Sequence, residues 1–550
     1  MFQRPKPEFI GNDPEFKEGH SKGALPGGAT DRLATGTVVL DYTVSSGHDE
    51  RYMHLLNRRR FISNAVATMA SLSCASGCKS SMDAGSGNRL KIIPHSDRAH
   101  AQVPKKFIGL SYDSNTLSDV NFFSASNEGL VDLFRKMTPN GVLRLGGGSL
   151  DVEWWAGSSS SDVPSLPPTF AIPPHPTGYA FRPFSVEITP ESIEALKGFL
   201  NATGWTCIYG LNLATGTPAR AAEEADFVAK TLGSLLEFFQ IGNEPDLYNR
   251  FCRNPATWSA DRYFDEWLPM ANAVRARVPH ARFALPDLGY VSTWFTPLVN
   301  RFLALPTAMR PNVIGLSYHY YALNLKYPTA TMSKLLKPDP VFDHISNECL
   351  GAAARLGIKC YITECNSCTG VNIPTELAGV FGSALWAADY TLKVMSLGYE
   401  GISMYTQRGI TAAFGQFISL ADPQSYKSKY PGSPICSPTT HMHVPEPVFY
   451  GMQFASNFAG ATFIDLDFSP GNVNATAYAA KLANGKIAVA IINKDPARSL
   501  EVDLSGFSSA LFLRGSSLTS NERVQLVGPI PIGDMSTIPS ACGVLLISKP

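Results

Sequence analysis

The sequence predicts an α/β protein in which a (β/α)8 TIM barrel is followed by an antiparallel β-sandwich domain. Strand-like and helix-like segments alternate from about residue 105 to residue 425, which is the pattern of parallel βα units. Beyond about residue 430, short strands follow one another without helices, as in a sandwich. Two acidic residues in similar settings end two of the barrel strands, where the sites of such barrels lie.

The composition bounds the class of protein. A chain of 550 residues is long enough for two domains with large cores, and its 44% hydrophobic and 17% charged residues are typical of a globular protein. Lys+Arg and Asp+Glu both number 46, so no basic field indicates a nucleic-acid partner. No run approaches the roughly 20 apolar residues of a membrane span. The aromatic content of 11% suits stacking on sugar rings, although an aromatic core has the same composition.

The first 87 residues read as a leader. Residues 1–52 are polar and aperiodic, and we expect them to be disordered and possibly untranslated, with translation starting at Met53. Residues 53–87 combine a basic stretch, a weakly apolar stretch and small residues, which predicts a signal segment and linker. Arg58-Arg59-Arg60-Phe61-Ile62 fits Arg-Arg-x-Phe-Ile, which resembles a twin-arginine signal, so we expect a secreted or periplasmic protein. A lipid anchor at Cys74 or Cys78, or a basic amphipathic helix instead of a signal, are the alternatives.

The barrel is assigned to residues 105–428 and the sandwich to residues 429–550, with residues 88–104 supplying an early strand that joins the sandwich. Eight strand candidates are Phe107–Tyr112, Val142–Gly146, Cys207–Asn212, Phe238–Asn243, Arg282–Pro286, Val313–His319, Cys360–Glu364 and Gly401–Tyr405. Helical stretches between them include Leu130–Met137, Glu191–Asn201, Ala219–Leu235, Ala260–Val278, Asn347–Leu356 and Leu377–Leu397. In the sandwich, Ala477–Leu482 and Lys486–Asn493 flank Asn484-Gly485, which predicts a hairpin with a type I′ turn. Further strands are expected at Leu500–Leu504, Ala510–Arg514, Arg523–Val527 and Gly543–Ser548.

Glu244 and Glu364 are the candidate catalytic residues. Glu244 stands between Asn243 and Pro245 at the end of a buried strand, and Pro245 restricts the backbone on either side of it. Glu364 ends the seventh strand candidate. Two carboxyl groups facing one sugar-sized cleft are what glycosidic cleavage needs, one protonated and one ionised. If the barrel brings them about 5–5.5 Å apart, the reaction proceeds with retention. Asn243 can then bond the substrate 2-hydroxyl.

These residues resemble the retaining glycoside hydrolases of clan A, and more narrowly glycoside hydrolase family 79, the β-glucuronidase and heparanase group. The resemblance rests on an ordered set of motifs over residues 90–550: Ile108–Asp113, Val142–Gly148, Gln240–Asp246, Leu316–Tyr321, Tyr361–Asn366 and Pro445–Asp465. It implies an exo-acting enzyme that works by double displacement, with Glu244 as acid/base and Glu364 as nucleophile. It also implies a glycoside or oligosaccharide as substrate, and no cofactor and no metal.

Further candidate substrate-binding residues stand at the other strand ends. Asp113 could bind a sugar hydroxyl. Gly146 and the two glycines after it allow close approach of a substrate to the backbone, and the Arg144 guanidinium could orient a carboxylate through a bidentate contact. The polar aromatic run His319-Tyr320-Tyr321 at the end of the sixth strand favours sugar contact, with His319 and Tyr320 as the candidates. The other candidates are Thr369, Gly370 and Tyr405.

The family motif carries a tyrosine and glycines after the nucleophile, whereas this chain has Thr369 and Gly370 there. Thr369 is too short to reach a uronate carboxylate as a tyrosine would, while backbone amides near Gly370 could still hold it. A neutral β-glycosidase of the β-xylosidase or β-glucosidase type therefore stays open, as does a non-catalytic carbohydrate-binding protein. Cys365 and Cys368 favour a structural pair or two free thiols over a redox or metal site. His441 and His443 lack the further ligands of a metal site.

Overall fold

The structure is a computed structural model that describes residues 89–157, 164–173, 181–324, 327–369, 377–406, 418–420 and 443–549. The expected leader over residues 1–87 lies outside this part of the chain, as do Gly370 and His441. None of the helices in the described ranges is both long and apolar enough to cross a membrane.

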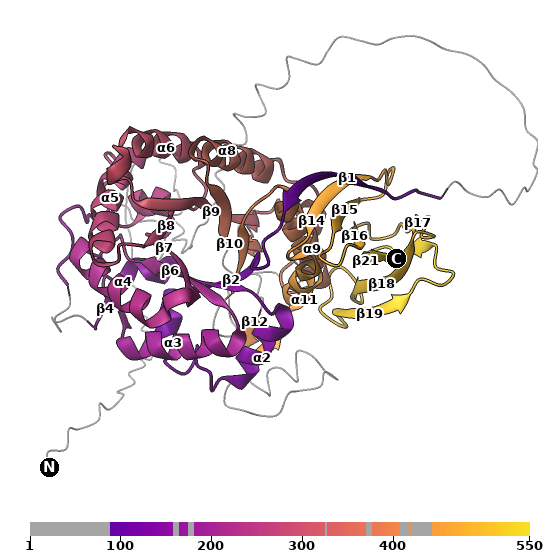
Figure 1. Ribbon diagram of the computed structural model, residues 1–550, viewed down its shortest axis with the longest axis horizontal. Helices are drawn as coiled ribbons and strands as arrows, with labels where there is room; N and C mark the ends of the chain where they lie inside the picture. The colour runs from indigo at the N-terminus through magenta and orange to yellow at the C-terminus, as the bar shows by residue number, and fades with distance from the viewer. Residues whose placement is uncertain are drawn as a thin grey trace, which may run out of the picture. The chain divides into compact units, whose positions relative to one another are not determined.

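Eight parallel strands close into a barrel, in the order β10-β11-β2-β3-β6-β7-β8-β9 (Figure 1). Their bounds are β2 Ile108–Asp113, β3 Val142–Gly146, β6 Thr206–Leu211, β7 Leu236–Ile241, β8 Arg282–Leu288, β9 Asn312–Asn324, β10 Lys359–Thr369 and β11 Gly401–Tyr405. All eight predicted strands and the barrel itself are confirmed. Strands β9 and β10 run past their expected ends because they stay paired as far as Asn324 and Thr369.

Helices surround the barrel (Figure 1). They are α2 Glu128–Met137, α3 Pro190–Thr203, α4 Pro218–Leu232, α5 Ala260–Arg277, α6 Phe295–Ala304, α7 Met332–Leu335, α8 Pro340–Leu356 and α9 Phe381–Ser396. Their ends follow local chemistry. Thr189 and Thr217 cap α3 and α4 through their hydroxyls, each ahead of a proline at the first helical position, where the missing N–H costs nothing. Helix α6 was not predicted, because an irregular run with Pro297 hides its start.

A seven-stranded antiparallel sheet packs beside the barrel, in the order β1-β14-β15-β16-β21-β18-β19. Its strands are β1 Ile93–Gln102, β14 Thr462–Asp467, β15 Ala475–Lys481, β16 Ile487–Asn493, β18 Phe507–Arg514, β19 Gln525–Pro531 and β21 Cys542–Ser548. A separate two-stranded ladder pairs β17 Leu500–Glu501 with β20 Thr537–Ile538. Strand β1, which precedes the barrel in sequence, pairs antiparallel with β14.

The two faces of this sheet belong to different hydrophobic cores. Along β16, Ala488, Ala490 and Ile492 belong to the large core shared with the barrel, whereas Val489 and Ile491 belong to a second core with Leu500 and Ile538. This alternation follows from the period of two along a strand. The face toward the barrel meets helix α9 and helix α11 Pro447–Ala455.

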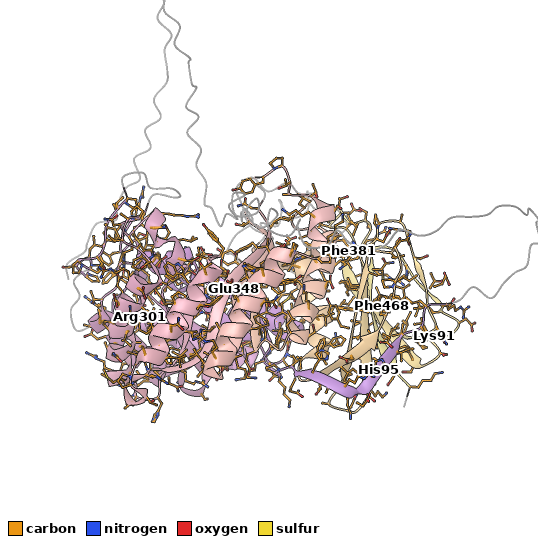
Figure 2. All side chains as sticks on the ribbon, turned by 90° about the horizontal axis from the view of Figure 1, so that it is seen from above. Lys91, His95, Arg301, Glu348, Phe381 and Phe468 are labelled. Atoms are coloured by element: carbon orange, nitrogen blue, oxygen red, sulfur yellow. The ribbon has the colours of Figure 1, made fainter. Side chains whose placement is uncertain are left out.

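Polar contacts reinforce this junction between barrel and sheet. Phe381, which is labelled in Figure 2, is the first residue of α9, and its amide donates to the Ser520 carbonyl at 2.8 Å. Farther along the helix, Asp389 accepts from the Tyr478 hydroxyl at 2.7 Å and forms an ion pair with Lys494, which is buried. The sheet is therefore attached to the outside of the barrel through α9.

The hairpin between β15 and β16 corrects one prediction. The pair forms as expected, but the turn is not type I′, which needs a positive φ at both central residues. Asn484 has a negative φ and Gly485 has φ 82°. The Gly485 amide donates to the Leu482 carbonyl at 2.9 Å, and the Leu482 amide donates to the Lys486 carbonyl at 2.9 Å. This is the three-residue loop in which glycine forms a bulge.

Candidate active site

Glu244 and Glu364 lie together at the C-terminal end of the barrel, although 120 residues separate them in the chain. A carboxylate oxygen of each and a ring nitrogen of His319 lie within 4.8 Å of one another. Both glutamate side chains retain slight exposure, 17% for Glu244 and 9% for Glu364. The closed barrel therefore brings the two glutamates into one cluster.

The backbone of Glu244 is held in an unusual conformation. Glu244 follows β7 by three residues and has φ 46° and ψ 51°, in the left-handed region that only a few per cent of non-glycine residues adopt. Its amide donates to the Asp287 carbonyl at 3.1 Å, and its carbonyl accepts from the Leu247 amide at 2.8 Å. Such strain persists where the surroundings over-determine it, and here it aims the carboxylate across the barrel.

Two irregularities in the barrel supply the polar floor beneath the pair. The register between β8 and β9 shifts at Asp287, and the register between β10 and β9 shifts at Thr363. A bulge redirects side chains that a regular strand would send elsewhere. Both side chains meet inside the barrel, where the Thr363 hydroxyl donates to Asp287 Oδ1. The Gln240 amide also donates to this oxygen, at 2.6 Å.

Arg144 lies at the centre of this floor and is fully buried. Its guanidinium donates to Glu364 Oε2 at 2.7 Å and to Asp287 Oδ2 at 2.7 Å. Further bonds go to Gln240 at 3.2 Å, Ser111 at 2.9 Å and Asn243 at 2.8 Å. Five protein acceptors thus use the five N–H groups of the side chain. The expectation that Arg144 grips a substrate carboxylate is wrong, because the guanidinium is already committed to Glu364 and Asp287.

Gly146 acts on Arg144 and not on a ligand. A Cβ at Gly146 would lie 2.4 Å from Arg144 Cζ. The absence of a side chain there lets the guanidinium fold back over the end of β3. The expected role in close approach of a substrate is therefore corrected to a role in placing Arg144.

His319 lies between the two acids and is fully buried. Its Nδ1 is 3.0 Å from Glu244 Oε1 and its Nε2 is 3.2 Å from Asp287 Oδ2. Burial alone would lower the pKa of His319, but the carboxylates of Asp287 and Glu364 raise it to about 10. The pKa of Asp287 is held well below its usual range, since Arg144 and His319 outweigh the effect of its burial. The expected sugar contact by His319 is corrected: the ring holds Glu244.

The cluster of Glu244, His319 and Glu364 has the spacing of a metal site. A metal needs the lone pair of a neutral imidazole. His319 is cationic at neutral pH and donates from both nitrogens, so this donor set does not suit a metal ion.

The two tyrosines that follow His319 face opposite sides of β9, as alternation along a strand requires. Tyr321 points into the barrel, where its hydroxyl donates to Glu364 Oε1 at 2.7 Å. Tyr320 points outward and donates to Asp339 at 2.6 Å, between the rings of Phe342 and Tyr390. The selection of Tyr320 as the candidate is wrong, and Tyr321, the third aromatic residue of the same run, is the one that contacts Glu364.

Asp113 and Tyr405 form a pair beside Glu364. The Tyr405 hydroxyl donates to Asp113 Oδ2 at 2.8 Å, and Tyr405 is buried. Burial, together with the nearby Glu364 charge, raises the pKa of Asp113 to about 6. Gly147 adopts φ 72°, and a Cβ there would lie 1.8 Å from Asp113 Oδ1, so only glycine leaves room for this carboxyl.

Two further predicted contacts stand at the margins of this cluster. The Asn243 side-chain oxygen accepts from Arg144 at 2.8 Å, so its NH2 group points away from the guanidinium. Thr369 is the last residue of β10 and is buried beside Asn324 of β9, five residues beyond Glu364. Gly370 lies outside the described residues.

Cys365 and Cys368 are both buried in β10.

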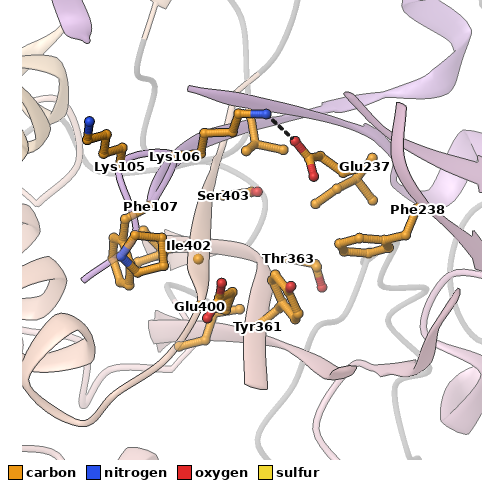
Figure 3. A pocket seen from close by; sticks show the side chains of 15 residues that line it. Lys105, Lys106, Phe107, Glu237, Phe238, Tyr361, Thr363, Glu400, Ile402 and Ser403 are labelled. Atoms are coloured by element: carbon orange, nitrogen blue, oxygen red, sulfur yellow. Dashed lines mark hydrogen bonds and ion pairs between the residues drawn. The ribbon is translucent and has the colours of Figure 1, made fainter. Parts of the chain in front are cut away.

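A hollow of about 200 Å³ lies at the opposite, N-terminal end of the barrel (Figure 3). The side chains of Phe238 and Tyr361 line it, and the ion pair of Lys106 and Glu237, 2.7 Å long, stands at its edge. Thr363 forms part of this hollow and also donates to Asp287, so a single residue separates the hollow from the floor of the carboxylate site.

Comparison with known proteins identifies distant relatives. No family model matches the chain. It is 25% identical over 228 residues to a protein of Aspergillus niger named beta-glucuronidase, which covers 38% of this chain and 42% of that protein. It is 24% identical over 361 residues to a protein of Neurospora crassa with the same name, and this match covers 58% of this chain and 61% of that protein. The chain thus matches about half the length of these curated relatives.

Solved structures resemble the fold. A 4-O-α-L-rhamnosyl-β-D-glucuronidase from Fusarium oxysporum is 14% identical with a TM-score of 0.58, covering 84% of this chain and 99% of that one. A family 51 arabinofuranosidase from Xanthomonas axonopodis is 14% identical with a TM-score of 0.56, covering 84% and 100%. An α-L-arabinofuranosidase from Thermotoga maritima is 12% identical with a TM-score of 0.58, covering 84% of this chain and 100% of that one. The chain therefore shares the barrel-and-sheet fold of these glycoside hydrolases, and its sequence is similar to two proteins named beta-glucuronidase.

Proposed function

We propose that the protein is a retaining glycoside hydrolase that acts from the chain end on β-glucuronides or related uronides. The observation that carries the proposal is the spacing of Glu244 and Glu364. One carboxylate oxygen of each lies within 4.8 Å of an oxygen of the other, which supports the short separation of retaining enzymes over the wider separation of inverting ones.

Glu364 has the surroundings of a nucleophile. Arg144 and Tyr321 each donate to one of its oxygens, which stabilises the ionised carboxylate and fixes its direction. Glu244 has the role of acid and base. Its only charged contact within hydrogen-bond distance among the described residues is His319, whose imidazolium donates to it. In the first step Glu364 attacks the anomeric carbon while Glu244 protonates the leaving oxygen. In the second step Glu244 takes a proton from a water molecule whose oxygen attacks the anomeric carbon, so the bond to Glu364 breaks and the sugar is released.

The uronide preference rests on the names of the relatives and of the Fusarium structural neighbour. One observation favours the second candidate, a neutral β-glycoside of the xyloside or glucoside type. Arg144, the buried cation of the site, is saturated by protein acceptors, and Asp113 adds a carboxyl group beside Glu364. A uronate would therefore need a donor from beyond this described cluster, such as the backbone near Gly370.

A panel of 4-nitrophenyl glycosides tests the proposal and separates the candidates. We expect kcat/KM for the β-D-glucuronide to exceed that for the β-D-xyloside and β-D-glucoside by about a hundredfold or more, the discrimination expected of a site that pairs a polar group of its substrate. A higher value for a neutral glycoside would replace the uronide assignment by the second candidate. Proton NMR of the first product distinguishes retention from inversion. No turnover of any glycoside would indicate a carbohydrate-binding protein.

A further inference from the structure

We propose that Asp246 is a positioning residue for the general acid, acting through the backbone of the loop that follows β8. This inference rests on the proposed function, since it assigns a role beneath Glu244. Asp246 lies two residues after Glu244 in the short 3-10 helix Pro245–Arg250 and is 4% exposed. Among the described residues, the hydrogen bonds of its side chain go to backbone amides after β8 and not to the side chains of the carboxylate site.

The Asp246 carboxylate accepts three hydrogen bonds from consecutive backbone amides. Oδ1 accepts from the Gly289 amide at 2.7 Å, and Oδ2 accepts from those of Tyr290 and Val291 at 3.0 and 2.9 Å. Hydrogen bonds to a charged acceptor are about twice as strong as those between neutral groups. One side chain therefore fixes the path of three residues that have left the barrel strand.

This loop forms a wall against the side chain of Glu244. A Cβ added to Gly289 would lie 3.0 Å from Glu244 Cδ and 3.2 Å from its Oε1. The Gly289 backbone thus limits how far the carboxyl group can swing away from His319. Burial raises the pKa of Asp246 to about 6, the Gly289 amide opposes this rise, and the Glu244 charge adds to it, which agrees with the closeness of the two acids.

The physical consequence depends on the leaving group. A displaced acid gives less proton transfer to the leaving oxygen, which matters when that oxygen is a poor leaving group and hardly matters when it is 4-nitrophenolate. A merely structural defect would lower the rates for both kinds of substrate together. The ratio of the two rates therefore reports on the position of Glu244.

The test compares kcat/KM of Asp246→Asn for methyl and 4-nitrophenyl β-D-glucuronide, or for the matching β-D-xylosides if the panel identifies the neutral sugar. Asparagine has nearly the same side-chain volume as aspartate. Its NH2 group, however, would replace one carboxylate oxygen and would face backbone N–H groups from which that oxygen accepts hydrogen bonds. We expect a loss of about tenfold or more for the methyl glycoside and less than about threefold for the nitrophenyl glycoside. The value of kcat/KM is used because it reports the first irreversible step, in which Glu244 acts as acid.

Two further variants keep the result interpretable. Asp495→Asn is the matched control, because Asp495 is also buried and also accepts from backbone amides, those of Ala497 at 3.1 Å and Arg498 at 3.0 Å, but lies in the sheet region. It should lower Tm without changing the ratio between substrates. If Asp246→Asn fails to fold, Gly289→Ala tests the contact between Gly289 and Glu244 directly. It should also lower kcat/KM for the methyl glycoside more than for the nitrophenyl glycoside.

Equal losses for both substrates in Asp246→Asn, or in Gly289→Ala when the first variant does not fold, would overturn the positioning role while leaving the hydrolase proposal intact. A wild-type chain that cleaves neither substrate of either pair would overturn the proposed function and this inference with it.

Discussion

At the scale of single residues, the two neighbouring tyrosines of β9 offer a sharp test of the site. Tyr321→Phe removes the donor to Glu364 Oε1 without changing the ring. We expect kcat/KM to fall by about tenfold to a hundredfold, because a preorganised donor to the reacting carboxylate is lost. Steady-state kinetics on the best nitrophenyl glycoside measure this effect.

Tyr320→Phe is the matched control for that variant. It removes a similar hydrogen bond, to Asp339, on the outer side of the same strand. It should lower Tm slightly and leave kcat/KM within about threefold. If both variants lost activity equally, the distinction between an inward and an outward tyrosine would fail.

Replacement of Glu364 tests the proposed nucleophile itself. Glu364→Ala should reduce kcat by several decades while the circular dichroism spectrum stays that of the wild type, because the covalent intermediate can no longer form. A variant that retained more than about a tenth of wild-type activity would contradict the role.

The sequence placed the two glutamates but misjudged some of their neighbours, and the reason is physical. Glu244 and Glu364 carry their strand-end setting in the sequence itself. The contact of Arg144 with Asp287 cannot be read from the sequence in this way. It depends on the register shifts at Asp287 and Thr363, which appear only in the closed barrel. Strict alternation from His319 would have chosen Tyr321 over Tyr320, had the inward direction of His319 been known.

At the scale of an element, the end of β3 depends on the lack of a side chain at Gly146. Gly146→Ala would place a methyl group 2.4 Å from Arg144 Cζ and push the guanidinium away from Glu364 and Asp287. Breaking a buried ion pair typically costs about 3–5 kcal/mol, so we expect a large fall in Tm together with loss of activity. Thermal melts and kinetics on the same preparation test both.

Gly351→Ala serves as the control for that variant. Gly351 lies within helix α8, where an added Cβ meets nothing within 4 Å. Alanine is favoured over glycine inside a helix by about 0.5–1 kcal/mol. This substitution should therefore raise Tm slightly and leave kcat/KM unchanged, and a fall in Tm would show that the two glycines are not distinguished by local space.

Elements were predicted more reliably than turns. The apolar runs that cross the barrel gave all eight strands because a strand buried on both faces leaves a continuous hydrophobic pattern. The turn at Asn484-Gly485 was misassigned, since the same two residues suit both a type I′ turn and a bulge with glycine in the left-handed region. The negative φ of Asn484 and the hydrogen bonds of Leu482 distinguish these two turns.

At the scale of the whole molecule, buried ionisable groups set how stability depends on pH. Burial raises the pKa of Glu224, which accepts from the Tyr209 hydroxyl at 2.7 Å, from 4.5 to about 7. The folded state therefore holds this proton more tightly than the unfolded chain, and the free energy of unfolding falls as pH rises from 4.5 to 7. His319 contributes stability that is complete below pH 6.5 and is lost as pH rises through about 10.

We therefore expect Tm to decline from about pH 5 to pH 10 in the wild type. Glu224→Gln, which can still accept from Tyr209, should flatten the decline between pH 4.5 and 7 and leave the slope above pH 7 unchanged. Differential scanning calorimetry over this range measures both. A variant whose Tm runs parallel to the wild type across the acidic half would show that another group, such as neighbouring Glu153, carries the effect.

The pairing of β1 with β14 orders events during synthesis. Strand β1 emerges from the ribosome before any part of the barrel, yet Gln102 must wait for Thr462, several hundred residues later, before its ladder can form. At ordinary rates of translation this delay lasts tens of seconds. The nascent barrel can close in that time, but β1 remains an unpaired edge, open to other nascent chains, until Thr462–Asp467 has been made.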